Sequence, residues 1–482
     1  MAFEDRLYPL LSLYIRSPQW VKFSLGQLYA LVPRALRYGR RYQRFQREAA
    51  VGDGAALQQL CQAKLAEALR WALETVPYYA RYRHLLGQLD APLAVLAQLP
   101  LVSKDMIKAD PQAFLSSALP ASARLSTFTG GSTANPMQFY LQKGSSRTRE
   151  YAYVASFQRR VGLDERSTVL ALRGRSVPTA RLGGPLWMYE PIKRQLILSC
   201  DHLERANMPE YVAAILRWRP AYIEAYPSAL VPLARWLSEH PEPRVTRAIR
   251  GILLYSENVY AEQLALLRSV FGCPILKHYG HSERVLMAAS MPDDERCFFW
   301  PQYGHLELVD ENDAPVTTPG QLGEIVGTGF DNQAMAFVRY RTGDLAVLSA
   351  APHPLLPGYP VVERIEGRLQ EFLVCNDRRL ISICTMGAAH FDELAAVEAL
   401  QYEQRVPGHV ILKVVAATPL SASARAHIIS AVQQKTQGGC TAEIQTVAQI
   451  ARTRRGKHQM LIQHVDLSSY YGASRDVVPA AS

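Results

Sequence analysis

Thr129-Gly130-Gly131-Ser132-Thr133 is a run of residues whose types suit the binding of an anion. Adjacent glycines allow backbone N–H groups to turn toward an anion, and the serine and threonine hydroxyls add further donors. The run can therefore cradle the oxygens of a triphosphate. It is not a P-loop, because no Lys-Ser or Lys-Thr pair follows at the required spacing. The alternative is a plain Gly/Ser/Thr turn without a ligand.

Two later runs end in a carboxylate. Glu283 ends Tyr279–Glu283, and a carboxylate beside phosphates suits Mg²⁺, which takes few protein ligands. Tyr279 offers a flat ring that can pack against adenine. Asp344 ends Tyr340–Asp344, where a carboxylate held by a Thr-Gly turn can accept two hydrogen bonds from a ribose diol. The alternatives are a helix cap in the first run and a polar turn between strands in the second.

A fourth candidate is Lys457, which follows Gly456 in the basic run Arg452–Lys457. A lysine on a loop can enter a site and neutralise charge that develops on a transferring phosphoryl group. The alternatives are a solvated basic run or an RNA-binding patch.

The elements that would position these residues alternate between strand and helix in the middle of the chain. Such alternation indicates a parallel sheet with right-handed crossovers. The expected strands are 167–174, 221–226, 251–255 and 274–279, and the expected helices are 228–240 and 261–271. Ligands bind beyond the carboxyl ends of strands in such sheets. The residues at these ends are Tyr226, Ser256-Glu257-Asn258 and Tyr279-Gly280-His281-Ser282-Glu283.

The pattern changes to short strands and Gly, Pro and Asp turns over 304–348, which indicates a β-rich subdomain. A hairpin at 372–383, a strand at 411–417, a helix at 424–434 and a strand near 443–447 indicate a compact α+β module. The expected fold class is α/β, with a large N-terminal domain of parallel α/β sheets plus the β-rich subdomain, and a small mobile α+β C-terminal domain. The expected divisions are 1–122, a helical region packed on the core; 123–366, the core; and 367–482, the C-terminal lid.

The order of the candidate runs resembles that of a known superfamily. Thr129–Pro136 resembles the phosphate loop of adenylate-forming enzymes, and Tyr279–Glu283 resembles their aromatic–Gly–x–Ser/Thr–Glu element. Tyr340–Asp344 resembles their ribose-binding turn. Gly367-Arg368 resembles their domain hinge, and Gly456-Lys457 their C-terminal catalytic lysine.

The residues of three segments are similar to those of the phenylacetate–CoA ligase branch of this superfamily. Within that branch they are similar to CapK-like proteins associated with capsule and other polysaccharide biosynthesis. These segments are Val76–Tyr79, Tyr226–Leu230 and Tyr279–Arg284. Three departures stand out, one of which is Lys277, just before Tyr279, for which the resemblance offers no role. Ala134 replaces the usual second glycine of the phosphate loop, so that turn must avoid positive φ or bear strain. The common hinge aspartate is absent at Gln370, with Glu371 the nearest acid.

The resemblance implies a function and a set of site residues. The chain would use ATP and Mg²⁺ to activate a small carboxylic acid as an acyl-adenylate. Lys457 would be catalytic, Glu283 would bind the metal, and Tyr226 and His281 would lie near the acid. The residues implied at ATP or AMP are Thr129, Gly130, Gly131, Ser132, Thr133, Ser256, Glu257, Asn258, Tyr279, Gly280, Ser282, Asp344 and Arg368.

The second nucleophile stays open after the sequence has been read. CoA is the default for this branch, an amine or hydroxyl on a sugar is the main alternative, and AMP transfer to a cofactor is a third. The sequence identifies neither the acid nor the oligomeric state.

Composition narrows the class of protein. The seven cysteines are scattered and form no CxxC pair, which argues against a disulfide framework and a zinc site and fits a reducing cytoplasm. We find no apolar run of about 18 residues that would predict a spanning helix. The acidic start of the chain lacks the basic residues of a secretory signal.

The net charge of +10 is concentrated at the N-terminus, where residues 1–50 hold nine arginines and lysines against three acids. Leucines and aromatic residues in the same stretch can form an interfacial helix, so peripheral attachment to the inner membrane face is one expectation. The alternative is a helical pair packed on the main domain. A rival class is a non-enzymatic basic protein that binds nucleic acid or membranes through 1–50 and 452–457. It leaves the order of the motifs unexplained, so we expect no nucleic-acid partner.

Overall fold

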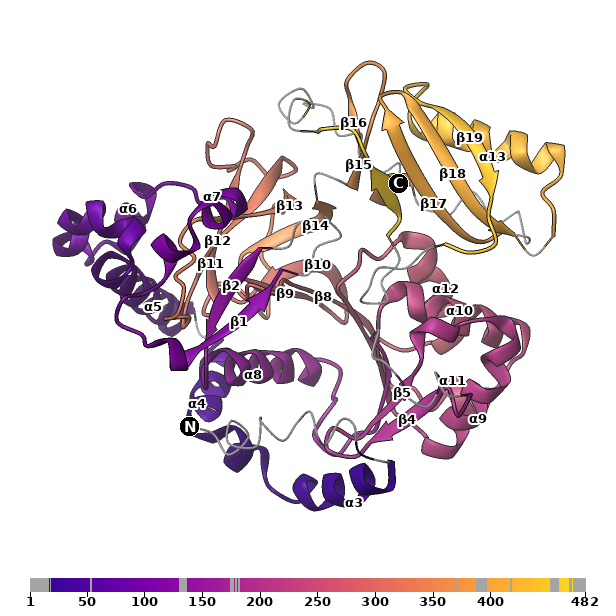
Figure 1. Ribbon diagram of the computed structural model, residues 1–482, viewed down its shortest axis with the longest axis horizontal. Coiled ribbons are helices and arrows are strands. Elements are labelled where there is room, and N and C mark those ends of the chain that lie inside the picture. The colour runs from indigo at the N-terminus through magenta and orange to yellow at the C-terminus, as the bar shows by residue number, and fades with distance from the viewer. Residues whose placement is uncertain are drawn as a thin grey trace.

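The computed structural model describes residues 17, 19–52, 54–129, 137–173, 177, 180, 183–368, 371–386, 397–416, 418–450, 459–467 and 470. Within these residues, a twelve-stranded mixed sheet forms the frame of the large N-terminal domain (Figure 1). Its strand order is β11-β12-β13-β14-β10-β9-β8-β7-β6-β3-β5-β4. The parallel sheet and the β-rich region expected from the sequence are therefore halves of one continuous sheet.

The parallel half follows the predicted strand–helix alternation. Its strands are β3 (Val169–Leu172), β5 (Gln195–Leu198), β6 (Tyr222–Ala225), β7 (Gly251–Tyr255) and β8 (Ile275–Gly280), with β4 (Trp187–Glu190) antiparallel at the edge. The associated helices are α9 (Met208–Trp218), α10 (Pro227–Glu239), α11 (Pro243–Thr246) and α12 (Ala261–Phe271). Strands β3, β6 and β7 are buried along their whole length, as parallel strands covered on both faces are.

The antiparallel half continues the sheet from β8. Its strands are β9 (Met287–Met291), β10 (Asp294–Phe299), β11 (Gly304–Val309), β12 (Leu322–Gly329), β13 (Tyr340–Leu348) and β14 (Val361–Arg368). Register shifts interrupt the pairing of β13 with both of its neighbours and of β10 with β9. Such bulges bend and twist a sheet, so this half curls strongly.

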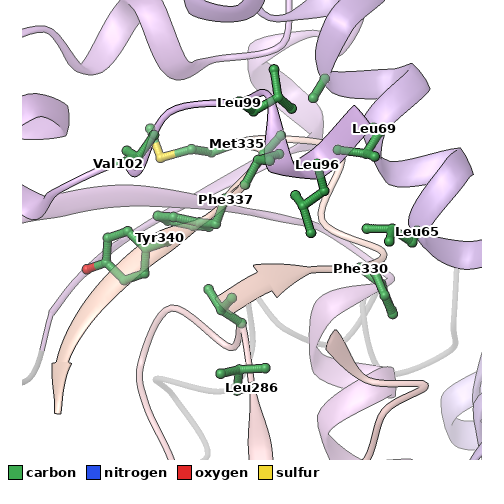
Figure 2. Close-up of a cluster of buried hydrophobic side chains, with 14 of the residues drawn as sticks. Leu65, Leu69, Leu96, Leu99, Val102, Leu286, Phe330, Met335, Phe337 and Tyr340 are labelled. Atoms are coloured by element: carbon green, nitrogen blue, oxygen red, sulfur yellow. The ribbon is translucent and has the colours of Figure 1, made fainter. Parts of the chain in front are cut away.

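N-terminal helices pack against the antiparallel half. They are α5 (Gly54–Thr75), η2 (Pro77–Gln88), α6 (Pro92–Ala97) and α7 (Lys104–Ala109). Figure 2 shows leucines of these helices packed around Phe337, with Tyr340 and Leu286 at the margin of the same cluster. Each buried side chain of this size stabilises the fold by about 1.5–3 kcal/mol. The cluster holds Tyr340 and Leu286 in place. Tyr340 is on the same strand as Asp344, and Leu286 follows Glu283 by three residues.

Two further helices, α4 (Arg34–Ala49) and α8 (Ser146–Arg159), pack against each other, with Phe45 and Phe157 in a second buried cluster. Helix α3 (Gln19–Ala30) lies at the lower margin of the molecule, beside β4 (Figure 1). No helix in the described part of the chain is both long enough and apolar enough to cross a bilayer.

The small C-terminal domain has its own sheet and core, as the sequence predicted. A hairpin of β15 (Phe372–Val374) and β16 (Leu380–Ser382) precedes a sheet of order β19-β18-β17-β20, covered by α13 (Ala422–Lys435). The bounds of this sheet are β17 (Val397–Val406), β18 (His409–Ala416), β19 (Thr441–Thr446) and β20 (Leu461–Gln463). Leu345 of β13 packs on Phe372 and Val374 where the domains meet. The mobility of this domain and the divisions at 122/123 and 366/367 stay predictions.

Candidate active site

Asp344 joins three elements through hydrogen bonds. Its Oδ2 accepts a hydrogen bond from the Tyr279 hydroxyl at 2.8 Å, and its Oδ1 lies 3.4 Å from Nε of Arg368, its partner residue across the β13–β14 ladder. Its N–H bonds to the Thr342 hydroxyl at 3.1 Å, and Gly343 supplies the turn with φ 77°. Burial, and then the charge of Asp344, hold the pKa of the Tyr279 hydroxyl well above its usual value, so this hydroxyl is a donor. A carboxylate has about four acceptor sites, which leaves Asp344 capacity for a ligand's hydroxyls.

The bond between Tyr279 and Asp344 depends on the curl of the sheet. Strands β8 and β13 are separated by β9, β10 and β14 in the sheet order. In a flat sheet they would lie about 19 Å apart, too far for a tyrosine and an aspartate to meet. The bulged antiparallel half therefore folds back toward the end of β8 and brings the two residues together.

Glu283 is a buried carboxylate in the turn after β8. Its Oε1 accepts a hydrogen bond from the Tyr340 hydroxyl at 2.9 Å, and no other described residue donates a hydrogen bond to it. Burial, and then the charge of Glu283, raise the pKa of Tyr340 well above its usual value, so the phenol stays protonated as the donor. Mg²⁺ prefers one or two carboxylates together with phosphate oxygens and water. The uncommitted oxygen of Glu283 fits that role.

The segment after Glu283 lies against glycines of β11 and β12. A Cβ at Gly304 would stand 2.1 Å from the carbonyl oxygen of Val285, and one at Gly327 would stand 2.7 Å from the Val285 side chain. The buried Arg149 also supports this segment, because its guanidinium donates to the carbonyls of Arg284 and Phe330. The position of Glu283 is thus set by elements far from it in sequence.

The predicted phosphate loop connects β1 (Arg124–Phe128) and β2 (Gln138–Gln142), which form an antiparallel hairpin. Thr129 closes the hairpin: its N–H donates to the Met137 carbonyl and its Oγ1 accepts from the Met137 N–H, both at 2.9 Å. No described residue accepts a hydrogen bond from the Thr129 hydroxyl. The predicted site residues outside the described part of the chain are Gly130, Gly131, Ser132, Thr133 and Lys457.

Ser256-Glu257-Asn258 follow β7 at its carboxyl end. Ser256 is exposed and adopts the left-handed φ of 63°. Glu257 accepts hydrogen bonds from the N–H and the hydroxyl of Ser228, both at 3.0 Å, in the first turn of α10. Asn258 donates to Glu371 Oε2 at 3.0 Å. The Glu257 and Asn258 side chains thus tie β7 to α10 and to the entrance of the C-terminal domain.

His281 stands beside Tyr279 with ring centroids 6.0 Å apart, edge to face. Both of its ring nitrogens are buried, and no described residue hydrogen-bonds to them. An unpartnered buried polar group costs about 1–3 kcal/mol, so a polar group that reached this ring would be favoured. Gly280 is exposed and Ser282 half-buried in the same turn, and Tyr226 is half-buried directly before α10.

Lys104 is a candidate that the sequence reasoning missed. The backbone of Val102 bonds to Arg339 and to Arg341, on either side of Tyr340, at 2.9 Å each. This pairing brings the half-buried Lys104 into the electrostatic field of Arg368 and Glu283. Burial, and then Arg368, lower the pKa of Lys104. The sequence around Lys104 gives only the signal of a helix N-cap at Ser103. The position of Lys104 near the site follows from the pairing of Val102 with β13, which the sequence does not show.

The described site therefore gathers two carboxylates, two cations and two phenols at the seam between the parallel and antiparallel halves. Asp344 and Tyr279 can recognise hydroxyl groups and a flat ring, and Glu283 can hold a divalent cation. Lys104 and Arg368 can neutralise anionic oxygens. Such a set suits a nucleotide phosphate ester.

Comparison with known proteins gives the family context. Residues 373–464 match the family model of the CapK C-terminal domain. Protein CapK of Staphylococcus aureus is 22% identical to this chain over 331 residues, which are 67% of this chain and 70% of that protein.

Solved structures share the fold. 2-Hydroxyisobutyryl-CoA ligase in the postadenylation state, in complex with R3-HIB-AMP, superposes with a TM-score of 0.64 at 17% identity, covering 85% of this chain and 90% of that one. The same ligase in its thioesterification state, with 2-HIB-AMP and CoA, gives 0.53 at the same identity and coverage. AtGH3.15 acyl acid amido synthetase gives 0.55 at 14% identity, covering 81% and 86%. The chain is therefore similar to CapK, with a family match over its C-terminal domain, and it shares the fold of 2-hydroxyisobutyryl-CoA ligase.

Proposed function

We propose that the protein is an AMP-producing ligase that uses ATP to convert a carboxylic acid into an acyl-adenylate. The observation that carries this proposal is the Tyr279–Asp344–Arg368 contact beside Glu283, at the end of the parallel strand β8. Ligand sites of α/β sheets lie at that edge. The fold shared with ligases solved as acyl-AMP complexes supports the same reaction.

In the proposed reaction, a carboxylate oxygen of the acid attacks the α-phosphorus of ATP, and the bond to the β-phosphate breaks to release pyrophosphate. Catalysis is then positioning plus neutralisation of charge. Asp344 would hold the ribose hydroxyls, Tyr279 would pack on adenine, and Lys457 would contact the acid and the α-phosphate. Glu283 would hold Mg²⁺, which, when bound, neutralises charge on the phosphates. Tyr226 and His281 would lie along the acid.

The remaining predicted residues complete the proposed nucleotide site. The residues from Gly130 to Thr133 and Ser282 would donate to the phosphates, and Thr129 would hold the base of their loop. Ser256, through its exposed left-handed backbone, and Gly280 would lie along adenine. Glu257 and Asn258 would act by holding this strand end, given their bonds to Ser228 and Glu371.

For the second step we propose transfer of the acyl group to a thiol, with CoA as the default acceptor and release of AMP. The C-terminal domain would rotate about Gly367-Arg368 between the steps. The better superposition on a postadenylation state than on a thioesterification state supports assignment of this conformation to the first step. Acylation of an amine or hydroxyl, as on a sugar in polysaccharide or secondary-metabolite biosynthesis, is the alternative. The match to CapK and the fold shared with an acyl acid amido synthetase support this alternative acceptor.

Pyrophosphate release with a panel of aryl, fatty, hydroxy and amino acids, each with and without CoA, tests the proposal. We expect release that depends on one class of acid and on Mg²⁺, with acyl-AMP or acyl-CoA visible by HPLC. Lys457→Ala should abolish ATP–pyrophosphate exchange while ATP binding persists. An AMP–cofactor adduct without acyl-AMP, or wild-type exchange in Lys457→Ala, would contradict the assignment.

We also propose a cytoplasmic location. The described cysteines form no disulfide, and the buried thiols of Cys297, Cys375 and Cys440 among them are suited to a reducing compartment. Alkylation of the protein in intact and in lysed cells, read by mass spectrometry, would show these thiols reduced if the proposal is right. Disulfides in the intact cells would contradict it.

A further inference from the structure

Helix α3 carries an apolar stripe on its solvent side. Residues eight and eleven positions apart along a helix lie on one face. Trp20 and Leu28 of α3, and Leu31 directly after its end, have this spacing. Their exposed fractions are 72%, 65% and 79%. Gly26, on the opposite face of the helix, is buried. The helix therefore turns its small residue to the protein and its large apolar residues to solvent, the reverse of an ordinary surface helix.

The stripe is part of a larger apolar surface, which we call the N-terminal patch. It comprises Trp20, Leu25, Leu28, Leu31 and Leu36, each more than half exposed, whereas Phe23 of the same helix turns its ring toward Tyr189 of β4, with 6.5 Å between the ring centroids. Exposed apolar residues scattered singly are normal, but a contiguous group marks an interaction site. The sequence alternative of a helical pair packed on the main domain holds for α4, whose Tyr42 and Phe45 are buried. It fails for the outer face of α3.

The charge around the patch indicates what would cover it. Residues 6–47 contain nine arginines and lysines and no aspartate or glutamate. Arg40, Arg41 and Arg47 on α4 are exposed, and no described acidic residue forms an ion pair with them. An exposed apolar face in a segment whose charges are almost all basic, with a tryptophan among its anchors, is complementary to an anionic bilayer surface, since leucines enter the acyl boundary and arginines meet lipid phosphates.

We propose that the N-terminal patch docks this protein on anionic membrane surfaces as an interfacial anchor. Helix α3 lies at the opposite end of the molecule from the C-terminal sheet (Figure 1). Docking through α3 therefore leaves the C-terminal domain away from the bilayer. The proposal does not depend on the chemistry assigned above, because the patch shares no residue with the candidate active site.

Flotation of the full-length protein with vesicles tests the proposal. The vesicles are phosphatidylcholine alone, or phosphatidylcholine with about one third phosphatidylglycerol. We expect flotation with the anionic vesicles, weakened by salt, and little with the neutral ones. The combined change Trp20→Ser, Leu28→Ser and Leu31→Ser should lower the partition coefficient more than tenfold. Arg40→Ala with Arg41→Ala and Arg47→Ala should lower it roughly a hundredfold, at about fivefold per charge.

Matched controls are available because the protein has exposed leucines elsewhere. Leu93 and Leu355 are 51% and 70% exposed, outside the patch. Serine at both should leave flotation unchanged, and the thermal transition of every variant should match wild type, since none of these side chains is buried. Absence of flotation in the wild type, or equal flotation of the patch variant, would overturn the proposal. So would a dimer, seen by light scattering, that the patch variant loses, because a second copy would then cover the surface.

Discussion

Lys104 lies outside the sequence motifs of the candidate site, yet it interacts electrostatically with Arg368 and Glu283. Methionine at this position keeps the apolar stem and removes the charge. If the lysine neutralises phosphate oxygens, Lys104→Met lowers kcat/KM for ATP about a hundredfold, the usual effect of removing one electrostatic donor from a prearranged site. The fold should persist, because burial and Arg368 already disfavour the charged form. Steady-state pyrophosphate release measures the effect.

Lys108 provides the control for that experiment. It lies on the same short helix and pairs with the exposed Asp105 at 3.5 Å. Lys108→Met should behave as wild type, since a surface pair contributes little. Equal kinetics for the two variants would remove Lys104 from the site.

His278 predicts a pH dependence of stability. Its ring lies 5.3 Å from that of Phe157 and 5.0 Å from that of Tyr255, and burial lowers its pKa from 6.5 to about 4. The unfolded chain therefore binds this proton first. The associated stability is complete above about pH 6.5 and is lost as the pH falls to about 4. At about 1.4 kcal/mol per pH unit, the loss is on the order of 3 kcal/mol.

His278→Phe should remove this part of the pH dependence, because phenylalanine fills the same space without a titrating group. Urea unfolding at about pH 7 and about pH 4.5 gives the two free energies of unfolding for each protein. An equal drop in wild type and variant would show that another group is responsible.

At the scale of single residues, the sequence predicted site residues from their type and local context, and the structure showed which residues they contact. Asp344 and Glu283 were predicted as carboxylates in turns, and the structure places both beside phenol donors. Tyr279 was predicted as an adenine platform, but its bond to Asp344 spans 65 residues and depends on bulges that carry no sequence signal. Thr129 was predicted as a ligand, yet it also closes its own hairpin.

At the scale of elements, the packing of Val285 on β11 predicts a sensitive glycine. An alanine at Gly304 would place its Cβ 2.1 Å from the Val285 carbonyl oxygen, a backbone atom that cannot rotate away. Gly304→Ala should therefore destabilise the domain by about 1–3 kcal/mol, as overpacking does. It should also weaken nucleotide binding by displacing Glu283.

Gly87→Ala is the matched control, because nothing lies within 4 Å of a Cβ there. Thermal unfolding and isothermal titration with AMP compare the two. A Gly304→Ala protein with wild-type affinity would show that Glu283 does not depend on this contact.

The proposed hinge predicts a different kind of defect. Gly367 has φ 92°, and a Cβ there would stand 2.1 Å from Glu371 Oε2, the atom that accepts a hydrogen bond from Asn258. Gly367→Ala strains the backbone and disturbs that contact. We expect acyl transfer to CoA to fall at least tenfold while ATP–pyrophosphate exchange falls less. An equal loss in both half-reactions would argue against a hinge at this glycine.

Elements with regular patterns were predicted well, and irregular ones were not. Strand β7 and helix α12 match their predicted ranges, because a buried strand and an amphipathic helix each have a clear period. The hairpin of β4 and β5 was not predicted; its edge strand β4 is only partly buried, unlike the equally short β3 and β6. The continuity of the sheet was also invisible, because sequence patterns do not say which strand lies at an edge.

At the scale of the whole molecule, the two-domain architecture followed from composition and pattern, whereas the orientation of the domains did not. Leu345 contacts Phe372 and Val374 through a small apolar interface, of the kind that permits relative domain motion. The N-terminal patch was predicted only as one of two alternatives, because basic and apolar content alone does not reveal which face of a helix is covered.

The hydrogen bond between Tyr279 and Asp344 links the parallel half of the curled sheet to the antiparallel half. A nucleotide that contacts both residues has affinity only for a sheet that is completely folded. Ligand at about a hundred times its Kd adds about 2.7 kcal/mol to the folded state, and here the gain would belong to both halves together. We expect AMP to raise the Tm of one cooperative transition in calorimetry; two transitions of which only one moves would contradict this. The substrate would then act as a folding ligand as well as a reactant.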